Sequence, residues 1–328
     1  MIELEFVVPF HGRSDYLFGA VARIRALRDT RWQLTIVEDC DPNGVAVQRE
    51  IDALGDGRIR YLRNDTRLGV NANSHRCIQL AQWDRFVMPG HDDLLMPDYG
   101  LRVAELIERY PDATVVQPHV RVIDERGEPS QPLADRVKRW IGPGGRRETE
   151  LRGESGVVSL LRGNWLYTPA CCYRRDKLQG GSYRPSIDAA HDLAFVVDVL
   201  MDGGSIVAGT DVAFEYRRHS ASHSSCVARS GLRFEQERRY FTEIAAQCHS
   251  RGWRKAELAA KWRVTSRLNA LSHVPAALRC GELTTAAKLL GHGVSARAIA
   301  PSPGSTGAAS GPSDDGPSGE EDPAYPRQ

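Results

Sequence analysis

Short apolar runs alternate with segments of helical periodicity through the first half of the chain. The runs have the length of buried strands and lie at residues 4–9, 33–37, 59–62, 86–88 and 114–117. The segments between them place apolar residues three and four positions apart, as amphipathic helices do, at residues 15–28, 45–54, 71–82 and 97–110. Parallel strands joined by crossover helices produce this alternation, so the pattern predicts a parallel α/β sheet.

The pattern is less regular in the second half. Residues 127–153 are rich in Gly, Pro and Arg without clear periodicity, which predicts a long loop of the kind that closes over a site. Beyond it we expect a helix, a strand, a helix and one or two strands at residues 157–161, 165–173, 191–201 and 205–216, and then helical segments over 231–296. We therefore predict one domain at residues 1–230 and a helical C-terminal segment at 231–298.

The final residues, 299–328, are dominated by Pro, Gly and Ser with an acidic cluster. Such a composition buries too little apolar surface to offset the entropy lost when a chain orders. We expect this tail to be disordered.

Composition limits the partners. The chain has 328 residues, 41% of them hydrophobic and 26% charged, with a formal net charge of +1. That near-neutral balance gives no electrostatic reason to expect nucleic-acid binding, so the expected partners are small or neutral molecules. The seven cysteines are scattered and lack paired metal-binding spacing, which predicts reduced thiols rather than a disulfide framework or a zinc site.

Targeting signals are not evident in the sequence. The first residues, MIELEF, are acidic where a secretory signal has a basic flank, and no later run approaches the ~20 apolar residues of a membrane span. We expect a cytoplasmic protein, and leave peripheral membrane contact and homo-oligomer formation open.

An acidic pair is the most distinctive chemical feature. In FVMPGHDDLLMPD, Asp92 and Asp93 follow a short strand and precede a helix. Ligands of open α/β sheets bind at the carboxyl ends of strands, and one or two carboxylates together with substrate phosphates hold Mg²⁺ or Mn²⁺. The alternative is that both acids only cap the following helix.

Two further strand ends carry polar side chains. LTIVEDCDPNG places Asp39 and Asp41 after the second strand, where a carboxylate can accept hydrogen bonds from a base or ribose. For Asp41, a turn closed with Asn43 is the favoured interpretation. VVPFHGRSDYL places His11 after the first strand, where an imidazole can meet a flat base, although a lone loop histidine is more often simply solvated.

The order of these motifs resembles that of the inverting GT-A glycosyltransferases of the family-2 type. The resemblance rests on VVPFHGRSDYL, IVEDC, RYLRNDTRLGVN and PGHDD, spans residues 3–125 and extends more loosely over 160–225. It implies a GT-A-type single-nucleotide-binding α/β domain with a mostly parallel central sheet. No G-x-G-x-x-G follows the first strand, so a dinucleotide-binding domain is not indicated.

The resemblance also implies roles for individual residues. His11 and Asp39 would surround the base, Arg67 would lie near the nucleotide, and Asp92 near the ribose and diphosphate. Asp93 would be the principal ligand of a divalent cation, Mn²⁺ or Mg²⁺. The sequence departs from the family where His91 replaces a common Asp and where Asn73, Ser74 and His75 replace A-R-N.

The second half supplies the remaining implied residues. SIDAAHDLAFVVDVL offers Asp192 as the catalytic base, with Asp188 as the alternative. GNWLYTPACCYRRDKL would line the acceptor side through Trp165. FEYRRHSASHSS would bring Arg217 and Arg218 to the diphosphate and His219 to the metal.

We therefore expect an inverting, metal-assisted glycosyltransferase that uses a nucleoside-diphosphate sugar and an unknown acceptor, which is a saccharide, a glycolipid or a small molecule. Two alternatives remain at this point. One is a catalytically inactive nucleotide-binding or scaffolding protein of the same fold. The other is a nucleotidyltransferase, which would be expected to carry a glycine-rich phosphate loop after the first strand.

Overall fold

A single large sheet organises the protein. The computed structural model describes residues 1–143, 146–178, 190–219 and 232–294. Nine strands within these residues form one sheet in the order β3-β2-β1-β4-β8-β6-β9-β5, with β7 paired to β9. The strands are β1 (Ile2–Phe10), β2 (Thr30–Glu38), β3 (Ile59–Arg63), β4 (Arg85–Val87), β5 (Leu94–Leu95), β6 (Val115–Ile123), β7 (Thr149–Arg152), β8 (Cys172–Arg174) and β9 (Ser205–Arg217).

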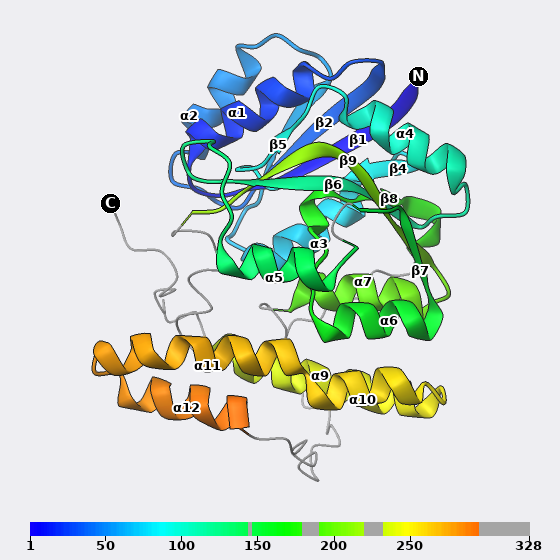
Figure 1. Cartoon of the computed structure of the whole chain (residues 1–328). Coiled ribbons are helices and arrows are strands. Elements are labelled where there is room, and N and C mark those ends of the chain that lie inside the picture. The colour runs from blue at the N-terminus through cyan, green and yellow to red at the C-terminus, as the bar shows by residue number, and fades with distance from the viewer. Residues whose placement is uncertain (144–145, 179–189, 220–231, 295–328) are drawn as a thin grey trace, which may run out of the picture.

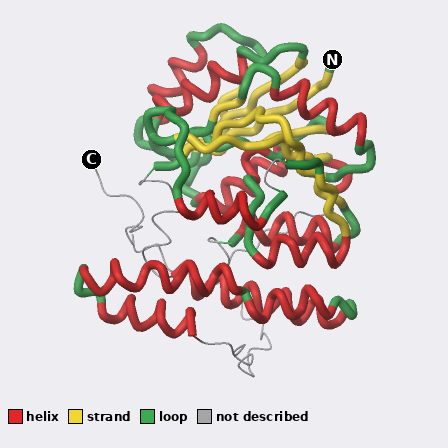
Figure 2. The backbone as a smooth tube through the Cα atoms, viewed as in Figure 1, coloured by secondary structure: helices red, strands yellow, loops and turns green. Residues whose placement is uncertain are grey.

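Helices cover both faces of this sheet (Figure 1 and Figure 2). One face carries α1 (Ser14–Arg25), α2 (Gly44–Asp52) and α4 (Tyr99–Arg109). The other carries α3 (Val70–Leu80), α5 (Leu133–Ile141), α6 (Gly153–Arg162) and α7 (His191–Met201). Below these lie the C-terminal helices α9 (Leu232–Ser250), α10 (Arg254–Trp262), α11 (Val264–Arg279) and α12 (Leu283–Val294), and two short 3₁₀ turns occupy Thr168–Ala170 and Arg175–Lys177.

The N-terminal half of the sheet is parallel, as the sequence predicted. β1 pairs in parallel with both β2 and β4, and β2 pairs in parallel with β3. Beyond β4 the sheet is mixed, because β8 runs antiparallel to β4 and β6, while β9 is parallel to β6 and antiparallel to β5 and β7. Strand order reverses between β1 and β4, which is where open α/β sheets bind their ligands.

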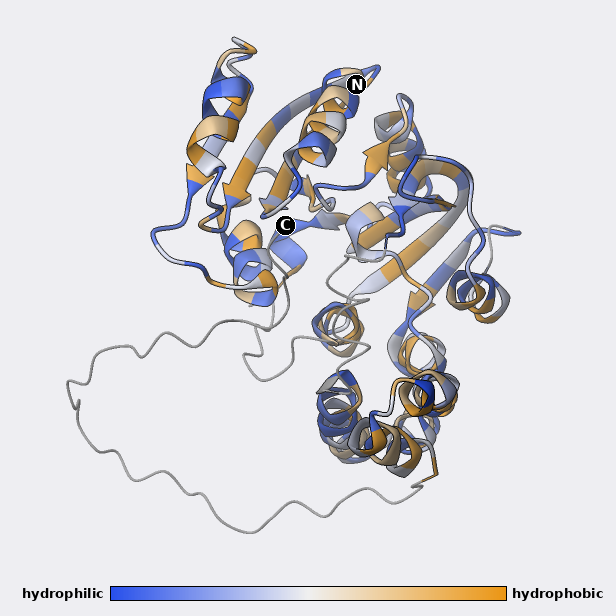
Figure 3. Ribbon diagram, turned by 90° about the vertical axis from the view of Figure 1, so that its left-hand side faces the viewer, coloured by the Kyte–Doolittle hydropathy of each residue, from blue (hydrophilic) through white to orange (hydrophobic). Residues whose placement is uncertain are grey.

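Both faces of β1 are buried, each in its own core. Leu4, Phe6 and Val8 belong to the core under α1, α2 and α4, whereas Val7 belongs to the core on the opposite face. Period-two alternation along a strand that is covered on both sides explains why the sequence shows a continuous apolar run there. The strands accordingly carry mostly hydrophobic residues in the view of Figure 3.

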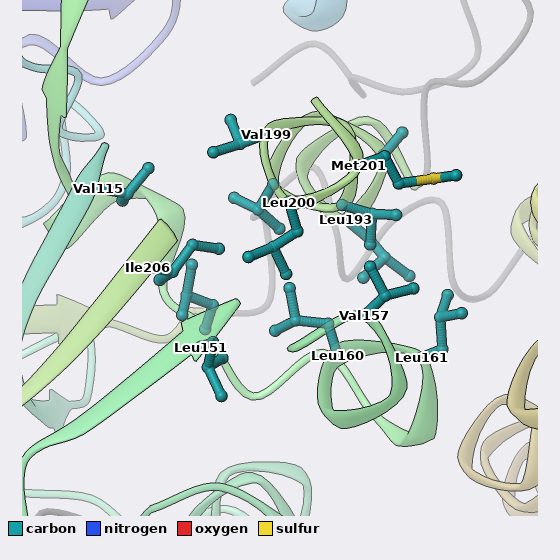
Figure 4. Packing of buried hydrophobic residues seen from close by; sticks show 14 of the residues in the cluster. Val115, Leu151, Val157, Leu160, Leu161, Leu193, Val199, Leu200, Met201 and Ile206 are labelled. Atoms are coloured by element: carbon teal, nitrogen blue, oxygen red, sulfur yellow. The ribbon is translucent and has the colours of Figure 1, made fainter. Parts of the chain in front are cut away.

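The core that contains Val7 joins the sheet to the C-terminal helices. Side chains from β6, β7, β9, α6 and α7 point toward one another in Figure 4; those labelled are Val115, Leu151, Val157, Leu160, Leu161, Leu193, Val199, Leu200, Met201 and Ile206. α10 then docks on α6, where the carboxylate of Glu154 accepts hydrogen bonds from the backbone N–H groups of Lys255 and Ala256, at 2.6 and 3.2 Å. The C-terminal helices are thus packed against the sheet domain through α6.

The prediction of a loop over residues 127–153 was wrong, because this segment contains α5 and β7. Leu133 and Val137 have helical spacing, but they point to solvent, so the usual hydrophobic signal is weak here. α5 is held instead by buried Asp135, which binds Arg218 from beyond β9. A tertiary contact decides the structure of this segment, and local composition does not show it.

One strand prediction also needed correction. Of the expected strand at 165–173, only residues 172 and 173 pair in the sheet, as part of β8. Before them, the backbone N–H of Tyr167 donates to the side chain of Gln117 at 2.7 Å, and Pro169 lies in a 3₁₀ turn, where its missing N–H costs nothing. The region 205–216 forms one strand, β9, and the two-residue strand β5 has too little sequence signal to be predicted.

The helices expected over residues 231–296 are present up to residue 294. Among the described residues, none of the helices combines the length and apolar character that crossing a membrane requires. The predicted disordered tail at residues 299–328 lies outside the described residues.

Candidate active site

Asp92 and His219 meet at the carboxyl edge of the sheet. Asp92 follows β4 and His219 follows β9, and Asp92 Oδ2 lies 2.9 Å from His219 Nε2. Both side chains are partly exposed, by 19% and 13%. Burial acts to raise the pKa of Asp92, but the hydrogen bond from His219 and the neighbouring His91 outweigh it, so the pKa is lowered. The pair therefore presents an ionised carboxylate and an imidazole at one point.

Asp93 is enclosed, in contrast to Asp92. Its side chain accepts hydrogen bonds from the backbone N–H of Arg217 at 2.9 Å and from that of Gly90 at 3.3 Å, and the residue is only 1% exposed. Burial, followed by the charge of Asp92, raises the pKa of Asp93 well above its ordinary value. Asp93 fastens the end of β9 to the turn after β4, and Asp92 is the more accessible carboxylate of the two.

Arg217 is largely committed to the surrounding backbone. Its Nε donates to the carbonyl of Asp92 at 2.9 Å, and its Nη1 donates to the carbonyls of Asp124 and Glu125 at 3.0 and 3.1 Å. Its guanidinium also lies 4.8 Å from the ring centroid of Tyr16. Arg217 therefore holds the loop after β4 and the turn after β6 together beside Asp92, and its expected role at a diphosphate stays a prediction.

The ends of β1 and β2 form the adjacent part of the edge. His11 Nδ1 lies 3.1 Å from the carbonyl oxygen of Asp39 and 3.6 Å from Asp41 Oδ2. Asp41 accepts hydrogen bonds from the backbone N–H groups of Gly12 and Asn43, both at 2.8 Å, so the predicted turn at Asp41 is confirmed. His11 and Asp39 therefore lie together, as the resemblance implied.

Asp39 organises the loop between β3 and α3. Its Oδ1 accepts hydrogen bonds from Asn64 Nδ2 at 2.8 Å and from the backbone N–H of Leu68 at 2.7 Å, and its Oδ2 accepts one from the N–H of Gly69 at 2.9 Å. Gly69 has φ +83°, a conformation that favours glycine. Arg67 lies exposed in the same loop. Asp39 thus fixes the loop that carries Arg67.

Asp192 lies in the first turn of α7, at its N-terminal end. Its Oδ1 is 2.9 Å from His191 Nε2, and its side chain is 48% exposed. Burial of its surroundings acts to raise the pKa of Asp192, but the charge of His191 and hydrogen bonds from His191 and Thr168 outweigh it and lower the pKa to about 2. The carboxylate is therefore ionised near neutral pH. Asp188, the alternative base, lies outside the described residues.

Tyr216 lies within electrostatic range of both the Asp92–Asp93 pair and Asp192. Burial raises the pKa of its hydroxyl, Arg218 lowers it, and the charges of Asp93, Asp92 and Asp192 raise it further. All three carboxylates are therefore within electrostatic range of one partly buried side chain, although they come from two segments about a hundred residues apart. The structure brings the predicted metal-side acids and the predicted base into one region.

A polar network beside Asp192 was missed from the sequence. Asp135 on α5 accepts hydrogen bonds from Arg218 Nε and Nη2 at 3.0 and 2.9 Å and from the hydroxyl of Tyr167 at 2.8 Å. Lys138 donates to the carbonyl of Leu166 at 3.2 Å, and its Nζ lies 4.4 Å from the ring centroid of Tyr167. The available signal was the helical spacing of Leu133, Val137 and Trp140.

Trp165, expected on the acceptor side, is 4% exposed. Its Nε1 donates to Ser159 Oγ at 3.1 Å, and its ring packs against Gly142, where any side chain would collide with it. The indole therefore helps to position the C-terminal end of α5, and its remaining exposed surface lines a cavity under that helix.

The residues at Asp92 fit a divalent cation. An octahedral ion holds its ligands at about 2.1 Å, and two neighbouring ligands at right angles then lie about 3 Å from each other. Asp92 Oδ2 and His219 Nε2 are separated by 2.9 Å, which matches this spacing. Within the described residues no group of three or more His, Cys, Asp or Glu side chains is arranged around one point. A cation here would take its other ligands from water and substrate phosphates, as Mg²⁺ commonly does.

Comparison with known proteins identifies a family profile and several relatives. The profile described as Glycosyl transferase family 2 matches residues 5–178, more than half of the chain. The uncharacterized protein y4gI of Sinorhizobium fredii is 28% identical over 116 residues, which are 34% of this chain and 13% of y4gI. The putative colanic acid biosynthesis glycosyl transferase WcaA of Escherichia coli is 27% identical over 95 residues, which are 29% of this chain and 34% of WcaA. The matches thus span a minority of each of these relatives.

Solved structures support the fold. Residues 1–349 of S. aureus TarS, crystallised in complex with UDP-GlcNAc, align with a TM-score of 0.62 at 13% identity, covering 90% of this chain and 81% of that chain. At this identity the likeness concerns the fold alone. Together with the family profile, it confirms the expected GT-A-type α/β fold with a helical C-terminal region.

Proposed function

The chain belongs to glycosyl transferase family 2, and on that premise we propose that it moves a sugar from a nucleoside-diphosphate sugar to an acceptor hydroxyl, with a divalent cation and with inversion of the anomeric carbon. The observation that carries the proposal is the contact of Asp92 with His219. It lies at the carboxyl edge of the sheet, beside the reversal of strand order between β1 and β4.

The nucleoside would bind at the ends of β1 and β2. His11 offers a flat ring to the base, and Asp39 fixes the loop that carries Arg67, so the base meets a preformed surface. A surface that is already ordered costs less entropy to occupy than one that orders on binding. The uridine nucleotide bound to the solved relative makes UDP the first candidate to test.

The diphosphate would lie at Asp92 and His219, which would hold a Mn²⁺ or Mg²⁺ ion together with the phosphate oxygens. When bound, such an ion neutralises charge that develops on the departing diphosphate. Asp93 would stabilise this arrangement, because it accepts hydrogen bonds from the backbone N–H groups of Arg217 and Gly90 and so fixes the turn that contains Asp92.

Asp192 would act as the catalytic base. Its carboxylate is ionised near neutral pH and half exposed, and it can accept the proton of the acceptor hydroxyl as the hydroxyl oxygen attacks the anomeric carbon. Attack from the side opposite the leaving diphosphate inverts the configuration in one step, and no covalent bond to the enzyme forms.

Thermal melting with nucleotides tests the proposal. The wild type is melted with UDP, GDP, dTDP and CDP, each with MnCl₂ or with EDTA, and compared with Asp92→Asn, His219→Gln and the control Asp202→Asn, an exposed residue at the far end of α7. A ligand at a hundredfold excess over its Kd stabilises the folded state by about 2.7 kcal/mol, a clear shift in Tm.

A metal-dependent shift with one nucleoside diphosphate, lost in Asp92→Asn and His219→Gln and kept in Asp202→Asn, supports the site. Release of that diphosphate from its sugar conjugate in a turnover assay separates a transferase from an inactive binding protein. No shift with any of the four nucleotides contradicts the proposed function.

A further inference from the structure

A cavity lies between α5 and the sheet. Its volume is about 260 Å³, and its walls come from β6, α5, the segment before β8 and β9. It opens where the pairing of β6 with β9 loses register, around His119, so that residues 209–211 of β9 are left without a partner on β6. Such irregularities redirect side chains and recur next to active sites.

Basic side chains outnumber acidic ones in the wall of this cavity. Arg121, Arg136, Lys138 and Arg139 line it, against the single carboxylate of Asp135. That carboxylate is already neutralised by the two hydrogen bonds from Arg218. Arg121 is paired with Glu215, which is not part of the wall. The cavity as a whole therefore presents an excess of positive charge, and three of these four cations are on α5.

The cavity lies near the proposed catalytic base, although Asp192 is not part of its wall. Tyr167 lines it and lies 5.0 Å from Tyr216, measured between ring centroids, and Tyr216 is the side chain that experiences the charges of Asp92, Asp93 and Asp192. Lys138, also in the wall, contributes to lowering the pKa of Asp192. A molecule in the cavity would thus be only a few side chains away from the point where an acceptor hydroxyl is deprotonated.

From the cavity, its charge and its position we propose that the α5 cavity, defined by Arg136, Arg139, Lys138, Gln131 and Tyr167, binds a phosphate ester carried by the acceptor. This inference rests on the proposed function, because it names the class of acceptor. Arginine forks match phosphate oxygens, and a cavity below the ~300 Å³ of drug-sized ligands suits a phosphate with a small polyol or sugar.

The phosphate ester has two sources, a soluble acceptor or a lipid headgroup. The outer face of α5 bears on this choice, because Leu133 and Trp140 are 71% and 81% exposed beside Arg136 and Arg139. A short apolar face with adjacent basic residues is suited to the surface of an anionic membrane. The shared chemistry is the phosphate ester, and the experiment below distinguishes its two sources.

Calorimetric titration with glycerol 3-phosphate tests the cavity. The probe is added to protein saturated with the nucleoside diphosphate and MnCl₂, so that the nucleotide site is already filled. Arg136→Gln and Arg139→Gln should each weaken the probe's binding about tenfold, the equivalent of one lost charged hydrogen bond. Arg49→Gln, an exposed arginine on α2, is the matched control and should bind as the wild type does.

Vesicle flotation identifies the source of the phosphate. Binding to phosphatidylglycerol vesicles but not to phosphatidylcholine vesicles, reduced in Trp140→Ser, would assign the phosphate to a lipid headgroup. No flotation, with the calorimetric result intact, would assign it to a soluble acceptor.

Equal affinity of the wild type and both arginine variants for glycerol 3-phosphate, or no binding to any of them, would overturn the inference. Far-ultraviolet circular dichroism and nucleotide binding of the same variants show that they are folded. Failure of the wild type to bind any nucleotide contradicts the proposed function. Nucleotide binding and binding of glycerol 3-phosphate are measured separately, so the two failures can be told apart.

Discussion

Asp135 on α5 and Arg218 after β9 form a bidentate ion pair, with Nε–Oδ2 and Nη2–Oδ1 distances of 3.0 and 2.9 Å. The carboxylate side chain is 4% exposed and the guanidinium side chain 24% exposed. Burial acts to lower the pKa of Arg218, but Tyr216 and the bond to Asp135 outweigh it and raise the pKa. This contact joins a helix on one face of the sheet to the segment that carries His219.

Removing the arginine should destabilise the protein. Arg218→Met leaves the buried carboxylate of Asp135 without its main partner, and we expect a loss of about 3 kcal/mol in the free energy of unfolding. Urea denaturation measures it. The double variant Arg218→Met/Asp135→Asn should recover part of the loss because it removes the buried charge. Arg31→Met, which breaks an exposed pair with Glu3, should cost less than about 1 kcal/mol. An equal effect of the two arginine variants would contradict this account.

Asp192→Asn should strongly slow turnover and spare nucleotide binding. An amide cannot accept the acceptor proton, and loss of a general base slows reactions by about 10²- to 10⁴-fold. The measurement is release of nucleoside diphosphate from the sugar donor in the presence of acceptor, alongside the nucleotide-induced shift in Tm. Asp202→Asn, at the other end of α7, should retain full activity. A fully active Asp192→Asn protein would remove Asp192 from the proposed mechanism.

Asp39→Asn should loosen the nucleoside side of the site. The amide nitrogen would face a backbone N–H of Leu68 or Gly69, so one buried hydrogen bond is replaced by a repulsion, at a cost of about 1–3 kcal/mol. We expect a lower free energy of unfolding in urea and weaker nucleotide binding by calorimetry. Asp65→Asn, an exposed acid in the same loop, should change neither. Unchanged nucleotide affinity in Asp39→Asn would separate the loop from the nucleotide site.

The C-terminal helices should be acid-sensitive through His292. Burial, followed by the nearby Arg263, lowers the pKa of His292 from 6.5 to about 4, while Glu237 acts to raise it. The unfolded chain therefore binds the proton first, and stability is lost as the pH falls from about 6.5 toward 4. We expect a loss on the order of 2 kcal/mol between pH 7 and pH 5.

Urea unfolding followed by circular dichroism at both pH values tests this prediction. His292→Gln should reduce the difference between the two pH values. His249→Gln, an exposed histidine on α9, should keep that difference. A difference that persists in His292→Gln would assign the acid sensitivity to another group.

Much of the fold could be predicted from the sequence because its helices and strands depend on neighbouring residues. β1 and β2 carry strong apolar runs because both faces of these strands are buried, and α1 and α2 each bury one mostly apolar side. α5 was not readable, because its apolar residues face solvent and its anchor, Asp135, depends on a partner 83 residues away. The placement of β7 against β9 likewise depends on pairing between distant segments.

The sequence by itself determined the parallel α/β core, the order of the motifs and the set of chemical groups at the strand ends, because these depend on periodicity and on residue type at neighbouring positions. Only the tertiary structure decided which of those groups are accessible. It enclosed Asp93 against Arg217 and left Asp92 beside His219, and it brought Lys138 of α5 within electrostatic range of Asp192. Those outcomes depend on hydrogen bonds and burial between segments far apart in the chain, which no local pattern encodes.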